Sequence, residues 1–67
     1  MLFKVENMSC QHCVNAITRA LQALDKHADV TVDLSKGEVS AHGQFSAADV
    51  IAALQEEDYP ATLIHAD

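Results

Sequence analysis

Aromatic side chains are scarce in this sequence: its 67 residues include no tryptophan, one tyrosine and two phenylalanines. Aliphatic side chains must therefore fill most of any core, and 49% of the residues are apolar. A chain of this length forms a small domain that buries only about 60% of its unfolded surface. Because this leaves little room for a large substrate pocket with a catalytic shell, the sequence favours a role other than catalysis. We expect residues 1–67 to form a single domain.

Basic residues are scarce as well: four lysines and arginines stand against ten aspartates and glutamates, for a net charge of -6. Such a surface repels phosphate backbones and anionic lipids, so neither nucleic acid nor a membrane surface is an expected partner. No segment approaches the ~20 apolar residues of a membrane span. Residues 1–5 also lack the long apolar run of a signal peptide. If Met1 is the natural start, the expected location is the cytoplasm.

Cysteine occurs only twice, at Cys10 and Cys13. In a reducing cytosol the two side chains stay thiols. A pair at this close spacing therefore indicates metal binding or redox chemistry before it indicates a structural disulfide.

Hydrophobic periodicity predicts four short strands and two helices. Apolar residues alternate with polar ones in the strands and recur at helical spacing in the helices. The predicted strands are residues 3–6, 30–34, 38–41 and 61–64. The first helix follows the cysteines, and its apolar stripe is Val14, Ile17, Leu21 and Leu24.

The start of the second helix has a clear local signature. Ser46 is a good N-cap, and Asp49 stands where the acidic partner of a capping box belongs. Phe45 and Val50 are placed to form a hydrophobic staple across the cap. Pro60 prevents the helix from continuing into the last strand. The resulting order, βαββαβ, predicts an α+β ferredoxin-like fold, with two helices on one face of a four-stranded antiparallel sheet.

The position of the cysteines in this order suits metal binding. Cys10 falls in the loop after the first strand, and Cys13 falls in the opening turn of the first helix. A helix N-terminus carries a partial positive charge and unpaired amide donors. Both favour the thiolate, which is the form that binds metal.

Two sulfurs make a small ligand set. Structural zinc takes four ligands, and the sequence has no second cysteine pair. Soft copper(I) accepts thiolates readily and needs only two or three ligands. An exposed site with so few ligands lets a partner's thiolates take the ion, which suits a carrier better than a storage protein.

A C-x-x-C pair also occurs in thioredoxin-like dithiol oxidoreductases. The chain is short for a thioredoxin fold, and Ser9 precedes Cys10 where those enzymes usually carry an aromatic residue. These features favour metal binding, although the spacing alone leaves a redox pair, or cysteines without a function, as alternatives.

The stretch Met8-x-Cys10-x-x-Cys13, between a strand and a helix, resembles the heavy-metal-associated domain. A separate chain of this length resembles the bacterial copper chaperones of the CopZ type within that family. The likeness implies that Cys10 and Cys13 are the metal ligands and that Met8 packs beneath the loop. It also implies that Tyr59 lies near the metal, shields it and influences its exchange. The sequence departs from the family pattern at Asn7 and Asp58, where the family often has glycine.

His12 is the remaining candidate at the site. Imidazole binds copper and zinc, so His12 is a possible third ligand or a bridge to a second chain. Adjacent helical residues diverge by ~100°, however, which strains joint binding of one ion by His12 and Cys13. We expect His12 to face solvent and to modulate metal exchange or its pH response.

The resemblance implies a cytoplasmic copper(I) chaperone. Such a protein would bind one Cu(I) and pass it by ligand exchange to a copper-transporting P-type ATPase or a copper-responsive regulator. A metal-bridged homodimer is a further possible assembly. The expected docking face is the cysteine loop with the exposed side of the first helix, at Asn15, Thr18, Arg19 and Gln22. The alternatives are a carrier of mercury, zinc or cadmium and a dithiol oxidoreductase.

Overall fold

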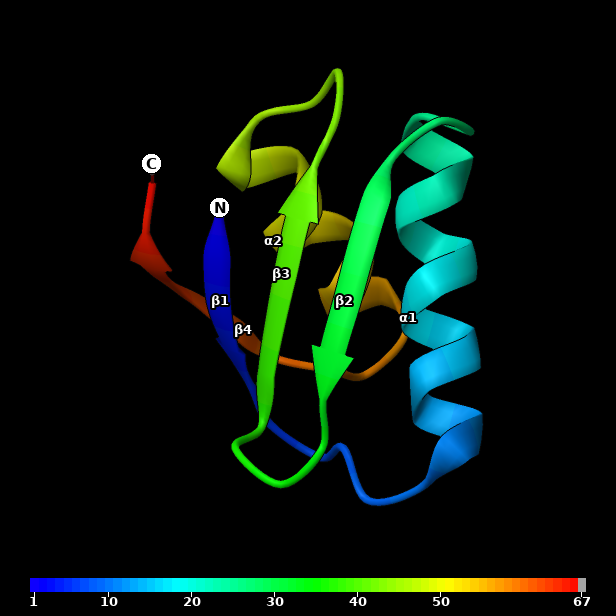
Figure 1. Ribbon diagram of the computed structural model, residues 1–67, viewed down its shortest axis with the longest axis vertical. Helices are drawn as coiled ribbons and strands as arrows, with labels where there is room; N and C mark the ends of the chain where they lie inside the picture. The colour runs from blue at the N-terminus through cyan, green and yellow to red at the C-terminus, as the bar shows by residue number, and fades with distance from the viewer. Residues whose placement is uncertain (67) are drawn as a thin grey trace.

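Four strands form one antiparallel sheet in the order β2-β3-β1-β4, and both helices lie on the same face of it (Figure 1). The computed structural model of the chain describes residues 1–66. Its elements are β1 (Leu2–Val5), α1 (Gln11–Leu24), β2 (Asp29–Asp33), β3 (Glu38–His42), α2 (Ala47–Glu56) and β4 (Ala61–His65). This is the βαββαβ arrangement that the sequence predicts, and the fold prediction is confirmed.

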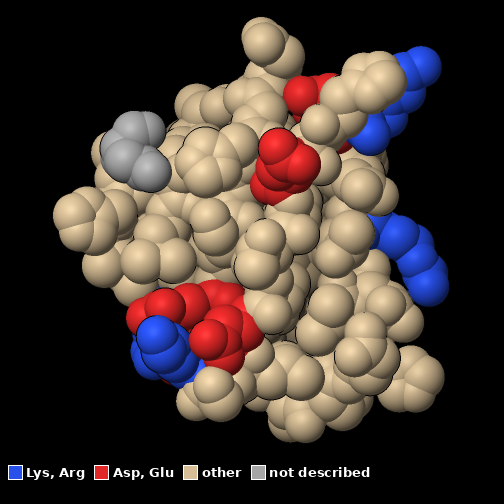
Figure 2. All heavy atoms as spheres, viewed as in Figure 1, with Lys and Arg blue, Asp and Glu red and all other residues tan. Residues whose placement is uncertain are grey.

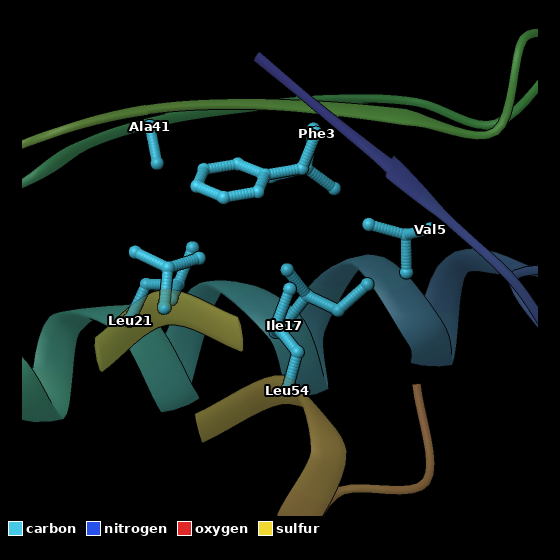
Figure 3. Close-up of a cluster of buried hydrophobic side chains, with 8 residues drawn as sticks. Phe3, Val5, Ile17, Leu21, Ala41 and Leu54 are labelled. Carbon is cyan, nitrogen blue, oxygen red and sulfur yellow. The ribbon is translucent and has the colours of Figure 1, made fainter. Parts of the chain in front are cut away.

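The core lies between the inner face of the sheet and the two helices (Figure 3). Side chains from β1 and β3 point toward the helices, and side chains from α1 and α2 point back toward the strands. Six of them are labelled in Figure 3: Phe3, Val5, Ile17, Leu21, Ala41 and Leu54. Burying a large apolar side chain contributes about 1.5–3 kcal/mol, so this layer holds the helices on the sheet.

The predicted capping box of α2 is present. The Ser46 hydroxyl accepts a hydrogen bond from the Asp49 N–H at 3.1 Å. The Asp49 carboxylate accepts one from the Ser46 N–H at 3.0 Å. Of the predicted staple, Val50 is fully buried in the core cluster, and Phe45 is half-buried and packs against that cluster. Local sequence signals therefore determine where this helix begins.

Two leucines that fit the apolar pattern are exposed. β2 pairs with β3 only from Asp29 to Asp33, so Leu34 begins the turn and is 36% exposed rather than buried in the strand. Leu24 is the last residue of α1 and is 41% exposed. The apolar pattern of the sequence extends one residue beyond the part of each element that packs against another element. Within residues 1–66, no helix is long and apolar enough to cross a membrane.

The Asp25 carboxylate ties the end of α1 to the loop before α2. It accepts hydrogen bonds from the Gln44 N–H at 2.9 Å and from the His27 N–H at 3.0 Å. These bonds hold the pKa of Asp25 below its usual value. A Cβ atom at Gly43 would lie 2.9 Å from the Asp25 carboxylate and 2.7 Å from the Phe45 ring. The close approach therefore requires glycine at this position.

We predict that Gly43→Ala lowers the free energy of unfolding by about 1–3 kcal/mol, because Asp25 and Phe45 must both move to admit the methyl group. Urea denaturation measures the change. Gln44→Ala is the matched control, since it keeps the backbone N–H that Asp25 uses. Equal stability of Gly43→Ala and the unaltered protein would contradict the account.

Candidate metal centre

Cys10 and Cys13 lie where the loop after β1 enters α1. Cys10 is the N-cap of α1, with an extended backbone (φ -158°, ψ 176°), and its carbonyl accepts the Cys13 N–H at 3.0 Å. Its side chain makes no capping hydrogen bond. One helical turn then brings the two sulfur atoms to the same side, 3.9 Å apart. The three-residue spacing thus produces the paired thiols that the sequence predicts.

The two thiols differ in exposure. Cys10 is exposed, while Cys13 is buried at 7% exposure. Cys13 continues the stripe of α1 that contains Ile17 and Leu21, both of which are fully buried. Packing of that stripe on the sheet therefore turns Cys13 inward and leaves Cys10 at the surface.

Several groups surround the Cys13 sulfur and favour its thiolate. The Tyr59 hydroxyl donates to it, and this is the largest effect on its pKa. The Ser9 N–H also donates to it, at 3.5 Å. With the further help of Cys10, these bonds outweigh desolvation and lower the pKa of Cys13 from 9.0 to about 6. Cys13 is therefore largely a thiolate at neutral pH.

Tyr59 shows the opposite shift. Donation of its hydroxyl proton to Cys13, with desolvation of the ring, raises the pKa of Tyr59 to about 12. The hydroxyl consequently keeps its proton at any physiological pH. The resemblance implies that Tyr59 lies near the metal ligands, and the opposite pKa shifts of Tyr59 and Cys13 agree with a hydrogen bond between the two side chains.

The two family glycines that this chain lacks correspond to left-handed residues. Asn7 has φ 69° and Asp58 has φ 66°, a region that asparagine and aspartate enter more readily than most residues. The Asn7 side chain donates through Nδ2 to the Asp58 carbonyl at 3.1 Å. The Asn7 carbonyl oxygen also lies 3.7 Å from the Cys13 sulfur, where it can accept a weak hydrogen bond from the thiol form of Cys13. Sequence reasoning missed both contacts.

The other predicted site residues take simpler positions. Met8 is half-buried and packs against the core, as expected for an anchor beneath the loop. His12 is the second residue of α1 and is exposed, as expected. Within residues 1–66, no group of three or more His, Cys, Asp or Glu side chains is arranged to hold a metal ion. Cys10 and Cys13 remain the candidate ligands.

Comparison with known proteins accounts for this architecture. Residues 2–60 match the family model of the heavy-metal-associated domain. The chain belongs to the heavy-metal-associated domain family. It is 36% identical over 59 residues to the copper chaperone CopZ of Bacillus subtilis (strain 168), which covers 84% of this chain and 86% of the relative.

Two solved structures extend the comparison. A gold-binding protein superposes with a TM-score of 0.86 at 30% identity, covering 91% of this chain and 94% of the other. The Cu2 form of the copper chaperone Atx1 from Synechocystis PCC6803 superposes with a TM-score of 0.89 at 24% identity, covering 92% and 98%. At that identity the second likeness establishes the fold alone. Copper chaperones carry metal and are not enzymes, so membership of the heavy-metal-associated domain family agrees with the prediction that the chain is not an enzyme.

We predict that Tyr59→Phe raises the pKa of Cys13 above about 6, because the thiolate loses its strongest hydrogen-bond donor. Titration of thiolate absorbance in a Cys10→Ser background isolates this one group. The lowered pKa also means that the unfolded chain binds more protons between about pH 6 and 9. Stability should therefore fall as the pH drops from 9 to 6, and less so in Tyr59→Phe. An unchanged pKa in the variant would contradict the assigned hydrogen bond.

Proposed function

We propose that this protein is a copper(I) chaperone that binds one Cu(I) through the thiolates of Cys10 and Cys13. The observation that carries the proposal is the pair of sulfurs 3.9 Å apart at a helix N-terminus. Among residues 1–66, no group of three or more His, Cys, Asp or Glu side chains could hold a metal ion. Copper(I) is soft and is satisfied by two or three sulfur ligands, whereas structural zinc takes four. The copper chaperone CopZ of Bacillus subtilis supports the same reading.

The unequal exposure of the two sulfurs suits transfer by ligand exchange. Cys10 is exposed, so a partner's thiolate can reach an ion bound to it. Cys13 is buried and already largely ionised at neutral pH, so little proton release accompanies its binding of metal. An incoming thiolate would add beside Cys10 first, and Cys13 would release the ion last.

The partner would be a copper-transporting P-type ATPase or a copper-responsive regulator, and two chains bridged by copper are a further assembly. The docking face would be the cysteine loop with the exposed side of α1. Asn15, Arg19 and Gln22 are exposed there, while the Thr18 hydroxyl turns back to the Val14 carbonyl at 2.8 Å. Residues 1–67 would form a single domain, so this face would be the surface that recognises the partner. The protein would act in the cytoplasm.

The cysteine loop of the proposed docking face carries little charge, although Arg19 of α1 and the neighbouring Glu57 line one hollow beside it. From Asn7 to Thr18 the sequence contains no aspartate, glutamate, lysine or arginine. Figure 2 shows that most of the visible surface, at the open face of the sheet, is also uncharged. Acidic and basic side chains gather over the turn between β2 and β3, and further charged side chains lie near the top of the view and along its right-hand edge. Shared metal ligation, more than charge steering, would therefore hold the complex together.

A carrier of another soft cation is the second candidate. The structural likeness to a gold-binding protein favours it, because gold(I) resembles copper(I) in its preference for sulfur. Zinc, cadmium and mercury have less support: the site offers no carboxylate beside the cysteines, in contrast to many zinc and cadmium sites. Metal competition separates these possibilities.

We predict that the reduced protein retains copper(I) against a competing chelator and prefers it to zinc(II). Cys10→Ser combined with Cys13→Ser should lower copper affinity by more than the ~10–100-fold that loss of an outer-shell partner costs. Circular dichroism checks that the double variant still folds. Preference for zinc, or copper binding that survives the double change, would refute the proposal. Gold(I) in the same competition tests the second candidate.

We predict that His12→Ala changes copper(I) affinity by no more than about twofold, the scale of an ordinary surface substitution. The reason is that His12 is exposed on the second residue of α1, away from the inward-facing stripe. The same chelator competition measures it, with Gln11→Ala as the matched exposed control. A loss beyond tenfold in His12→Ala alone would make His12 a ligand.

A further inference from the structure

Asn7 contacts both halves of the candidate metal centre. Its carbonyl oxygen lies 3.7 Å from the Cys13 sulfur, on the side of α1. Its side-chain nitrogen donates to the Asp58 carbonyl at 3.1 Å, in the loop between α2 and β4. It is thus a direct bridge between the cysteine loop and the loop that carries Tyr59.

The hydrogen bond from the Asn7 side chain to the Asp58 carbonyl extends the pairing of β1 with β4. The strands pair as far as Val5 and Ala61. The Glu6 N–H then donates to the Pro60 carbonyl at 2.9 Å. The Asn7 carboxamide supplies the next link, to Asp58. A side chain therefore takes over where the backbone ladder ends.

Tyr59 lies in the sequence between Asp58 and Pro60, whose carbonyls accept the hydrogen bonds from Asn7 and Glu6. Its own N–H donates to the Leu54 carbonyl at 2.9 Å. Proline also restricts the backbone directly after the tyrosine. A movement of this loop that carried Tyr59 away from Cys13 would stretch the bond from Asn7 to Asp58, together with the backbone bonds of Glu6 and Tyr59.

The backbone conformation alone does not require asparagine at this position. Glycine adopts φ near 69° more easily but has no side-chain donor. At Asp58, which is also left-handed, only the backbone carbonyl takes part in the contact. The carboxamide of Asn7 thus adds an interaction that a glycine would lack.

We propose that Asn7 is a positioning residue whose carboxamide holds the Tyr59 loop closed over Cys13 and thereby slows the departure of the bound metal ion. This inference rests on the proposed function. The link is a single exposed hydrogen bond, which corresponds to a change in rate of about two- to tenfold.

The first test compares Asn7→Gly with Asp58→Gly. Both variants keep a residue suited to a left-handed backbone, but only Asn7→Gly loses the donor, since Asp58→Gly retains the accepting carbonyl. Transfer of copper(I) to an excess of a chromophoric chelator should be about two- to tenfold faster in Asn7→Gly and nearly unchanged in Asp58→Gly. Urea denaturation of each variant separates this effect from general instability. Equal rates in Asn7→Gly and the unaltered protein would overturn the proposal.

A double-mutant cycle tests whether Asn7 acts through Tyr59. In a Tyr59→Ala background, which removes the ring, Asn7→Gly should cause little further acceleration. A residue that merely supports the cysteine loop would keep its full effect there, and that outcome would also overturn the proposal.

A metal-free measurement distinguishes failure of this inference from failure of the proposed function. Tyr59 is the only tyrosine and the chain has no tryptophan, so intrinsic fluorescence reports on this ring alone. Acrylamide should quench it more strongly in Asn7→Gly than in Asp58→Gly or the unaltered protein. If no variant bound copper but this difference appeared, the proposed function would fail while the positioning role stood. Identical quenching in all three would refute the positioning role whatever the metal.

Discussion

The site depends on the packing of one helical stripe against the sheet. Ile17 and Leu21 of α1 are fully buried and point toward the inner face of the sheet (Figure 3). Cys13 stands one turn earlier on the same stripe. Because the helix is held by those two side chains, the rotation of its first turn is settled as well. Cys13 is turned inward and Cys10, at the N-cap, stays at the surface. The hydrophobic core thus sets the difference between the two thiols.

This difference carries the chemistry of the site. The inner sulfur meets donors from the loop and from Tyr59, which lower its pKa to about 6. The outer sulfur remains accessible to a partner. The arrangement is well suited to an ion that is held briefly and passed on.

The cysteine loop is held from the opposite side by the α2–β4 loop. Asn7 and Asp58 stand where the family often carries glycine, and both adopt the left-handed backbone that glycine would favour. The chain therefore keeps the backbone path while gaining a side-chain contact between the loops. Pro60 and the backbone bond from Glu6 add to the same restraint. In this protein the surroundings of the sulfurs are more constrained than the short motif suggests.

The features that follow from local order were predictable from sequence. The Cys10–Cys13 spacing and the capping box of Ser46 and Asp49 each depend on residues within one turn of each other. Leu24 and Leu34 show where this reasoning reaches its limit, because periodicity does not reveal where an element loses its partner layer.

What the sequence by itself determined is the order of the elements, the place of the thiols at a helix N-terminus and the small size of their ligand set. Only the tertiary structure decided which thiol is buried, which donor lies on it and how the two loops are joined. The contact between Asn7 and Asp58 spans 51 positions. No local pattern encodes such a contact. It forms only when β1 and β4 pair and the α2–β4 loop lies next to the N-terminus of α1.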